Sequence, residues 1–113
     1  MATPIERGEV YWVNFDPGLG GEIKKTRPAI ILSNNAANTH LNRLQVVPIT
    51  SNTERLYPGE AYISLNSEKR KAMADQLTTV SKQRLSSRVG TLSKDDVSRV
   101  EDAILLQLGI ERS

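Results

Sequence analysis

Residues 7–33 read RGEVYWVNFDPGLGGEIKKTRPAIILS and predict two strands joined by a glycine-rich loop. Residues 7–15 alternate aromatic and β-branched side chains with polar ones, which favours a strand. Residues 16–26 contain a proline and three glycines, so a mobile loop is expected there. Residues 28–33 are a short apolar run that begins with Pro28, a position where a strand tolerates a missing N–H. The two strands and their loop therefore indicate part of a β-sheet domain.

The rest of the chain continues with short strands. Polar residues 34–42 predict a loop with at most one helical turn. The pattern predicts a turn at Tyr57-Pro58-Gly59 and further strands at residues 43–50, 60–65, 73–80 and 86–92. Pro48 marks an edge or a bulge in the strand at 43–50.

The clearest helix lies at the C-terminal end. Ser93 is a suitable N-cap with Asp96 three residues later, and Gly109 supplies a stop. Apolar residues recur at helical spacing at Val97, Val100, Ile104, Leu105 and Leu108, and predict a core or dimer contact. Five or more strands followed by one helix predict a mainly β (α+β) fold: a small, strongly bent antiparallel sheet or barrel closed by that helix.

Composition limits the possible classes of protein. A chain of 113 residues suits one domain, here residues 1–113, and 38% hydrophobic residues allow a small core that could lean on a subunit interface. There is no cysteine, which excludes disulfides and thiolate chemistry. No apolar run is long enough to span a bilayer, and the first residues do not resemble a leader segment. We therefore expect a soluble cytoplasmic protein without a membrane partner.

Charge is unevenly distributed although the net charge is only +2. Residues 17–94 carry twelve Lys/Arg against five Asp/Glu, whereas residues 95–113 carry two against five. A basic middle between acidic ends suggests a surface that faces a polyanion, although an ordinary solvated surface explains the charges equally well.

Several kinds of active site are excluded. His40 is the only histidine, so one chain cannot form a two-histidine ribonuclease site, and no Cys/His cluster has zinc spacing. The loop is not a phosphate-binding P-loop, because Ile23 stands where the motif requires glycine. An enzyme with this composition must use Arg, Lys, Thr, Ser, Asp, Glu and Gln. RNA cleavage suits that set, because the 2′-hydroxyl of RNA is itself the nucleophile.

Four motifs in register over nearly the whole chain resemble the MazF/PemK toxins of type II toxin–antitoxin systems. The start RGEVYWVNFDP is followed by a glycine-rich loop with Glu22 and by an R-P-A-I-I-L-S strand. The further matches are VVPITS at residues 46–51, ADQ at residues 74–76 and KQRL at residues 82–85.

This resemblance implies a bent sheet of the SH3-like-barrel (CcdB/PemK) type that pairs as a two-fold homodimer. It also implies sequence-specific, metal-independent cleavage of single-stranded mRNA, which leaves a 2′,3′-cyclic phosphate and a 5′-hydroxyl and needs no cofactor. The partner it implies is a cognate antitoxin that lays an acidic segment in the RNA groove.

The resemblance assigns catalysis to Arg27 and Thr50. One branch of the family has an arginine where this chain has Met73, so that branch's Arg–Asp pairing cannot operate here, and Asp75 and Gln76 are expected to position the RNA or contact bases. Glu22 and Ser51 are further candidates for catalysis or RNA binding. Candidates for contact with the RNA backbone are Lys24, Lys25, Arg55, Arg84 and Arg88. Trp12 is expected in the core.

Two other functions remain open at this point. One is a gyrase-poisoning toxin on the same fold, resembling CcdB, although the C-terminal Trp-Gly-Ile of that type is absent. The other is a catalytically inactive nucleic-acid-binding module.

Overall fold

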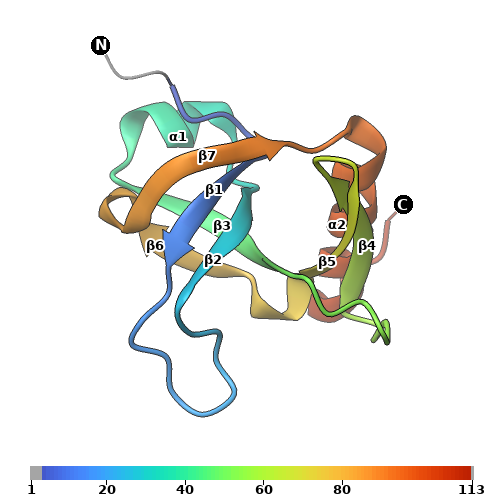
Figure 1. The fold of residues 1–113 in the computed structure, drawn as a ribbon. Coiled ribbons are helices and arrows are strands. Elements are labelled where there is room, and N and C mark those ends of the chain that lie inside the picture. Colours follow the sequence, from blue (N-terminus) through green and yellow to red (C-terminus); the bar gives the residue numbers. More distant parts are fainter. Residues whose placement is uncertain (1–3, 113) are drawn as a thin grey trace.

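A computed structural model describes residues 4–112. In chain order its elements are β1 (Glu9–Asn14), β2 (Thr26–Ile31), α1 (Asn35–His40), β3 (Arg43–Thr50), β4 (Glu60–Leu65), β5 (Glu68–Met73), a 3₁₀ turn (Ala74–Gln76), β6 (Thr78–Ser81), a second 3₁₀ turn (Lys82–Arg84), β7 (Leu85–Thr91) and α2 (Lys94–Leu108) (Figure 1). The expected strands at 43–50 and 60–65 match β3 and β4, and the turn at Tyr57–Gly59 is confirmed by the hydrogen bond from Glu60 N to Tyr57 O.

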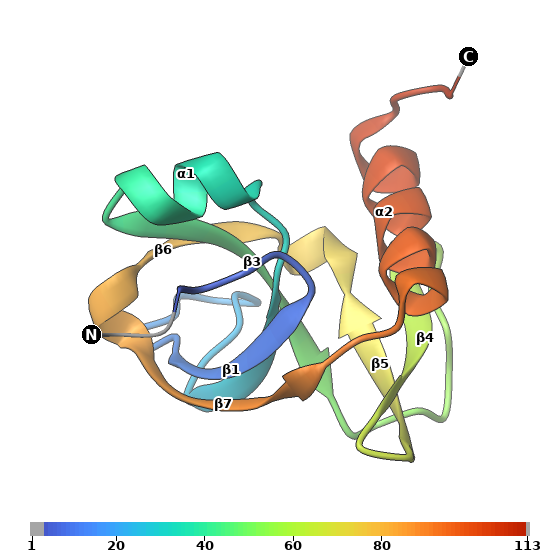
Figure 2. The same ribbon diagram turned by 90° about the horizontal axis from the view of Figure 1, so that it is seen from above.

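The strands form one antiparallel sheet in the order β4-β5-β3-β2-β1-β7, with β6 also paired to β3. β3 keeps β2 on one side and exchanges partners on the other: residues 43–46 pair with β6, and residues 49–50 pair with β5. The exchange divides the sheet into a large part around β1, β2, β3, β6 and β7 and a small part made by the end of β3 with β5 and β4. Figures 1 and 2 show the small part turned away, with α2 beside it.

Pro48 lies at this exchange. Gln45 directs its N–H to the Ser33 hydroxyl and accepts from Leu32 N–H, so its backbone groups face the β2 side. Backbone groups alternate in direction along a strand, so the Pro48 nitrogen faces the side opposite β2. On that side the pairing with β6 has ended and the pairing with β5 has not begun, so no hydrogen bond of the sheet requires an N–H at Pro48. The sequence suggested an edge or a bulge at Pro48, and that expectation was wrong. Pro48 instead marks the point where a central strand changes its partner.

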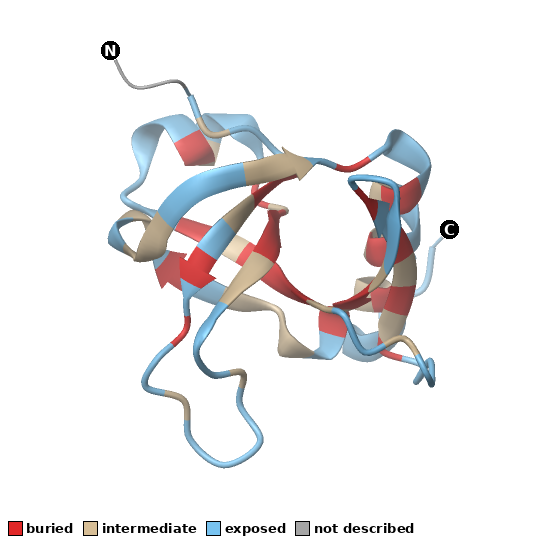
Figure 3. Ribbon diagram, viewed as in Figure 1, coloured by how far each residue is buried: buried red, intermediate tan, exposed pale blue. Residues whose placement is uncertain are grey.

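Two apolar clusters lie on opposite faces of the sheet. The cluster under α2 contains Val10, Ile30, Val47, Ile49, Ala61, Ile63, Leu65, Ala72, Ala74, Leu92, Val100 and Ala103. The cluster inside the bend of the large part contains Val13, Phe15, Ala29, Ile31, Leu44, Val46 and Val80. Figure 3 shows these buried positions along the central strands, while the loop at 16–26 is largely exposed.

The caps of α2 match the sequence signals. The Ser93 hydroxyl accepts from Asp96 N–H, and Gly109 ends the helix with a left-handed φ of 71°. The Asp96 carboxylate bonds Ser64 N–H of β4 at 2.8 Å and Arg99 at 2.6 Å, and so ties the helix start to the small sheet. Val100 is fully buried in the core, but Leu108 is 58% exposed.

Three further expectations about local structure were wrong. Residues 73–80 are not one strand: Met73 ends β5, a 3₁₀ turn follows, and β6 starts at Thr78, while β5 itself was missed. Pro28 is the third residue of β2 and not the first. The β2–β3 pairs end one residue away, at Ala29–Pro48, so the missing N–H of Pro28 leaves no pair of this ladder without a donor. Trp12 is 39% exposed and does not belong to either core cluster. No helix within residues 4–112 is long and apolar enough to cross a membrane.

Candidate functional site

Arg27 and Thr50 lie on neighbouring strands although 23 positions separate them in the chain. The register of β2 against β3 runs through the pairs Ala29–Pro48, Ile30–Val47 and Ile31–Val46. The ladder ends at Ala29–Pro48, and the same register continued by two residues would set Arg27 across from Thr50, with both side chains on one face of the sheet. The fold thus places the two candidates near adjacent ends of β2 and β3.

Both side chains are half-buried and keep free donors. The Nε of Arg27 donates to the Lys24 carbonyl at 3.0 Å, and its two terminal nitrogens have no partner among residues 4–112. The Thr50 hydroxyl oxygen accepts from Asn52 N–H at 3.2 Å, and within the same residues its hydrogen has no acceptor. A guanidinium end and a hydroxyl hydrogen are therefore available to an anion placed between the strands.

The same row continues into the small sheet. Thr50 is the register partner of Lys71 on β5, and Lys71 is the register partner of Tyr62 on β4. Arg27, Thr50, Lys71 and Tyr62 thus form a line across four strands on the face away from α2, which we call the cross-strand row. Sequence reasoning missed Lys71 because β5, with the charged sequence EKRKAM, lacks the alternation that predicts a strand. Tyr62 lies in the expected strand at 60–65, but only β5 connects that strand to Thr50.

The loop at 16–26 is held by its own bonds and by Gln76. One carboxylate oxygen of Glu22 accepts a hydrogen bond from Leu19 N–H at 3.0 Å. In the same turn, Glu22 N–H donates to the Leu19 carbonyl. The Gln76 amide accepts from Ile23 N–H at 3.2 Å and donates to the Gly21 carbonyl at 3.0 Å. A Cβ on Gly18 would lie 2.5 Å from the Ile23 carbonyl, so this position requires glycine.

A polar cavity of about 280 Å³ opens beside this loop. Four candidates line it: Glu22, Asp75, Gln76 and Arg84. Arg84 donates to the carbonyls of Asn14 and Asp16 at 3.0 and 2.6 Å, so its guanidinium holds the base of the loop. Gln76 and Arg84 are thus already engaged in positioning the loop, and neither Arg27 nor Thr50 lines this cavity.

A second polar cavity, of about 320 Å³, lies at the other end of the row. It is lined by Asn52, Glu54, Arg55, Tyr57 and Lys71. Arg55 and Ser51 are exposed, as are Lys24 and Lys25 in the loop. These exposed candidates stand on either side of the Arg27–Thr50 pair in the chain.

Arg88 lies apart from both cavities, in a cluster with Glu9 and Tyr11. Its guanidinium pairs with the Glu9 carboxylate at 2.7 Å, and Tyr11 donates to the same carboxylate at 3.2 Å. Burial raises the pKa of Glu9, but hydrogen bonds from Glu6 N–H, Arg88 and Tyr11 together outweigh burial and leave the pKa below its ordinary value. Arg88 therefore neutralises a buried carboxylate.

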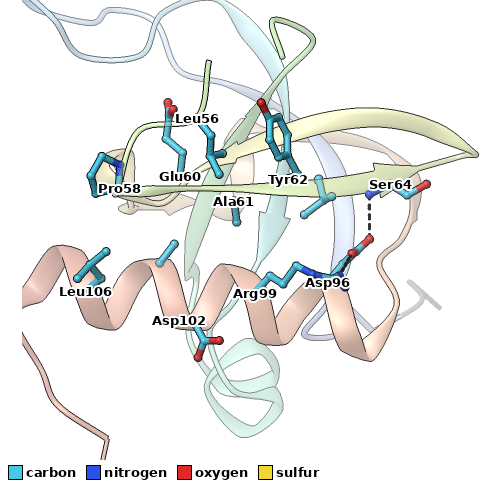
Figure 4. A pocket seen from close by; sticks show the side chains of 12 residues that line it. Leu56, Pro58, Glu60, Ala61, Tyr62, Ser64, Asp96, Arg99, Asp102 and Leu106 are labelled. Carbon is cyan, nitrogen blue, oxygen red and sulfur yellow. Dashed lines mark hydrogen bonds and ion pairs between the residues drawn. The ribbon is translucent and has the colours of Figure 1, made fainter. Parts of the chain in front are cut away.

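A cavity of about 610 Å³ contains none of the candidates. It lies between β4 and α2, with Ala61 and Leu106 among its lining residues, and Figure 4 shows Asp96 bonded to Ser64 at one end. Its lining is mainly apolar, which does not suit a phosphate. No group of three His, Cys, Asp or Glu side chains within residues 4–112 is placed to hold a metal ion, and His40 is exposed at the end of α1.

Comparison with known proteins identifies the family. The model of the PemK-like, MazF-like toxins of type II toxin–antitoxin systems matches residues 6–108. The chain belongs to this family. Endoribonuclease MazF9 of Mycobacterium tuberculosis is 32% identical over 115 residues, which cover 94% of this chain and 98% of that protein. The endoribonuclease toxin MazF of Escherichia coli is 29% identical, covering 92% and 94%.

Solved structures agree on the fold. A MazF crystal structure from Deinococcus radiodurans has a TM-score of 0.85 at 26% identity, covering 96% of this chain and all of that one. An endoribonuclease from a mycobacterial species, solved with its cognate antitoxin, has a TM-score of 0.80 at 24% identity, covering 96% and 99%. The expected bent antiparallel sheet with a C-terminal helix, of the CcdB/PemK type, is confirmed.

The Glu9 cluster generates a stability prediction. Glu9→Gln should lower the free energy of unfolding at pH 7 by about 1.5–3 kcal/mol, the scale of hydrogen bonds to a charged group. Because the folded-state pKa of Glu9 lies below 4.5, this contribution is complete above pH 4.5 and disappears as the pH falls through the folded-state value. Urea unfolding from pH 3 to 7 measures the difference, with Glu111→Gln, an exposed carboxylate, as the control. A difference that stays constant with pH would refute the assignment.

Proposed function

We propose that this chain is an endoribonuclease toxin that cleaves single-stranded RNA without a metal ion. The observation that carries the proposal is the pairing of β2 with β3 up to Ala29–Pro48, which leaves Arg27 and Thr50 near adjacent strand ends on one face, each with a free donor. Membership of the MazF-like toxin family and the likeness to two proteins named as endoribonucleases support it.

The proposed reaction is an internal transfer within the RNA. The 2′-oxygen attacks the adjacent phosphorus, loses its proton, and forms a bond to phosphorus, while the bond from phosphorus to the 5′-oxygen of the next nucleotide breaks. The leaving oxygen takes up a proton. The products are a 2′,3′-cyclic phosphate and a 5′-hydroxyl, and no external nucleophile is consumed.

Arg27 and Thr50 would stabilise the charge that develops on the phosphorane. The terminal nitrogens of Arg27 can bind two non-bridging oxygens at once, a fork that a lysine cannot supply. The Thr50 hydroxyl can donate to the same group from the neighbouring strand. Because arginine side chains stay protonated in proteins, the main contribution of Arg27 would be transition-state stabilisation and not removal of a proton.

The remaining candidates would bind the RNA chain on either side. Lys24, Lys25 and Arg55 are exposed and free of ion pairs within residues 4–112, so they suit contact with the phosphate backbone. Ser51 is exposed next to Thr50 and could add a donor. The cavity lined by Glu22, Asp75 and Gln76 offers donors and acceptors to a base edge. The guanidinium groups of Arg84 and Arg88 already bond to other groups of the protein, so these two residues have fewer donors left for RNA.

An antitoxin partner follows from the family. Solved relatives include MazE–MazF complexes from Deinococcus radiodurans and the mycobacterial complex named above. We propose that an acidic segment of the cognate antitoxin covers the surface around Lys24, Lys25 and Arg55 and competes there with RNA. RNA and the acidic segment are both negatively charged, and the protein surface that would bind them is positively charged. Added salt should therefore weaken the binding of both ligands.

The test of the activity is cleavage of a long single-stranded RNA in EDTA. We expect discrete fragments whose 5′ ends carry a hydroxyl, since the leaving group is the 5′-oxygen, and fragment ends that map to one short recognition sequence. Addition of an acidic peptide should slow the reaction. RNA binding with unchanged RNA length would instead indicate an inactive binding module, and inhibition of gyrase without RNA cleavage would indicate a CcdB-like toxin.

Removal of the Arg27 side chain tests the site. Arg27→Ala should lower the single-turnover rate by at least about 10²-fold, the scale for loss of one transition-state donor, and Thr50→Val should also lower it. Arg43→Ala is the matched control, because Arg43 is an exposed arginine at the opposite end of β3. Near-normal cleavage by folded Arg27→Ala protein would remove Arg27 from the active site.

Pairing of two chains is also proposed. Three apolar side chains at the end of α2 and just after it are exposed: Leu106 is 62%, Leu108 58% and Ile110 53% exposed. This apolar end suits contact with a second copy of the chain. We expect light scattering to give twice the chain mass at micromolar concentration. Leu108→Asp should shift the mass toward the monomer; an unchanged dimer would place the interface elsewhere.

A further inference from the structure

Lys71 is a buried lysine in the cross-strand row. Its side chain is only 7% exposed, and its ammonium donates to the Arg55 carbonyl at 2.8 Å and pairs with the Glu60 carboxylate at 3.0 Å. The Glu60 side chain is 10% exposed. A buried ion pair costs desolvation on both partners, so its presence beside Thr50 requires a structural account.

The pair holds the connection between β3 and β4. Glu60 accepts from Tyr57 N–H at 2.9 Å with the oxygen that also meets Lys71, and the Tyr62 hydroxyl donates to the Thr53 carbonyl at 2.9 Å. The backbone of the 51–59 segment is thus fastened at Thr53, Arg55 and Tyr57 by side chains of β4 and β5. In Figure 4 Glu60 and Tyr62 point away from α2, on the face where this segment runs.

The segment begins at the residue after Thr50 and sets the surroundings of its hydroxyl. Asn52 N–H donates to the Thr50 oxygen, and Glu54 N–H donates to the Asn52 side chain, so the first turn of the segment decides in which direction the Thr50 hydrogen can point. Thr50 and Lys71 are also direct register partners. Displacement of the segment would therefore move the Thr50 donor.

We propose that Lys71 is a positioning residue for RNA cleavage, which acts by clamping the 51–59 segment through Arg55 and Glu60 and thereby orienting Thr50. This inference rests on the proposed endoribonuclease function. Lys71 does not itself touch the RNA, since its ammonium is buried and already engaged with the Arg55 carbonyl and Glu60. Lys69, two residues earlier, is an exposed lysine over the Tyr62 ring at 3.9 Å and has no such contacts.

The clamp has an energetic signature. Loss of Lys71 alone leaves the Glu60 carboxylate buried and without its cation, whereas replacement of both partners by neutral groups removes that penalty. Glu60→Gln keeps an acceptor for Tyr57 N–H. The double variant Lys71→Met/Glu60→Gln should therefore be less impaired than Lys71→Met, which is not expected of a lysine that contacts phosphate.

The first measurement needs no RNA. Trypsin cleaves after Arg55, an exposed residue within the clamped segment, so the rate of cleavage of the Arg55–Leu56 bond reports opening of the segment. Lys71→Met should raise that rate by at least about tenfold, and the control Lys69→Met should leave it unchanged. If Lys71→Met does not fold, Glu60→Gln tests the same clamp. Equal rates in wild-type protein and folded clamp variants would overturn the proposal.

The second measurement separates positioning from binding. Lys71→Met should lower kcat by about 10- to 100-fold, the scale for slight misplacement of a catalytic group, with KM nearly unchanged. Lys69→Met should retain kcat, and the double variant should recover part of the loss. A raised KM with normal kcat would mean that Lys71 binds RNA directly. If the wild-type protein cuts no RNA, the proposed function fails and the positioning role fails with it, while the trypsin rates still decide whether Lys71 clamps the segment.

Discussion

The exchange of partners along β3 is the constraint on which the architecture depends. On one side β3 pairs with β2 through residues 46–48, and on the other side it pairs with β6 at its start and with β5 at its end. This exchange requires a gap in the ladder, and Pro48, which has no N–H to leave unpaired, occupies it. The small sheet then turns away, α2 covers one of its faces, and the opposite face continues the row that starts at Arg27. Apolar core, helix and candidate site all follow from that bend.

Charged side chains near the site divide into those that build it and those that remain free. Arg84 holds the base of the glycine-rich loop, Arg88 neutralises Glu9, and Lys71 is buried against Glu60. Arg84 donates to two backbone carbonyls, whereas Arg88 and Lys71 each pair with a carboxylate that has little exposure to solvent. Within residues 4–112, the terminal nitrogens of Arg27 and the ammonium groups of Lys24 and Lys25 form no hydrogen bond or ion pair with the protein. A polyanion would therefore meet preformed surroundings with a few unneutralised cations.

The two segments that flank the Arg27–Thr50 pair are organised in a similar way. In each, backbone groups of an irregular stretch are held by side chains from elements distant in sequence: Gln76 for the loop at 16–26, and Glu60, Tyr62 and Lys71 for the segment at 51–59. Irregular backbone has no ladder partners of its own, so side-chain bonds must supply its order. Segments held by side chains on both sides would suit the proposed site, in which one phosphate would lie between two strands.

The sequence by itself determined the strands with clear alternation, the caps of α2 and the family, because these depend on local periodicity and on motifs readable in order. It also selected Arg27 and Thr50, through their motifs. It failed where tertiary contacts override local pattern: the charged β5 is a strand because β3 and β4 pair with it on both sides, and Trp12 is exposed despite its place in an alternating strand. Only the fold decided the strand pairing that leaves Arg27 and Thr50 near adjacent ends of β2 and β3, and the burial of Lys71, since both arise from pairings between segments far apart in the chain.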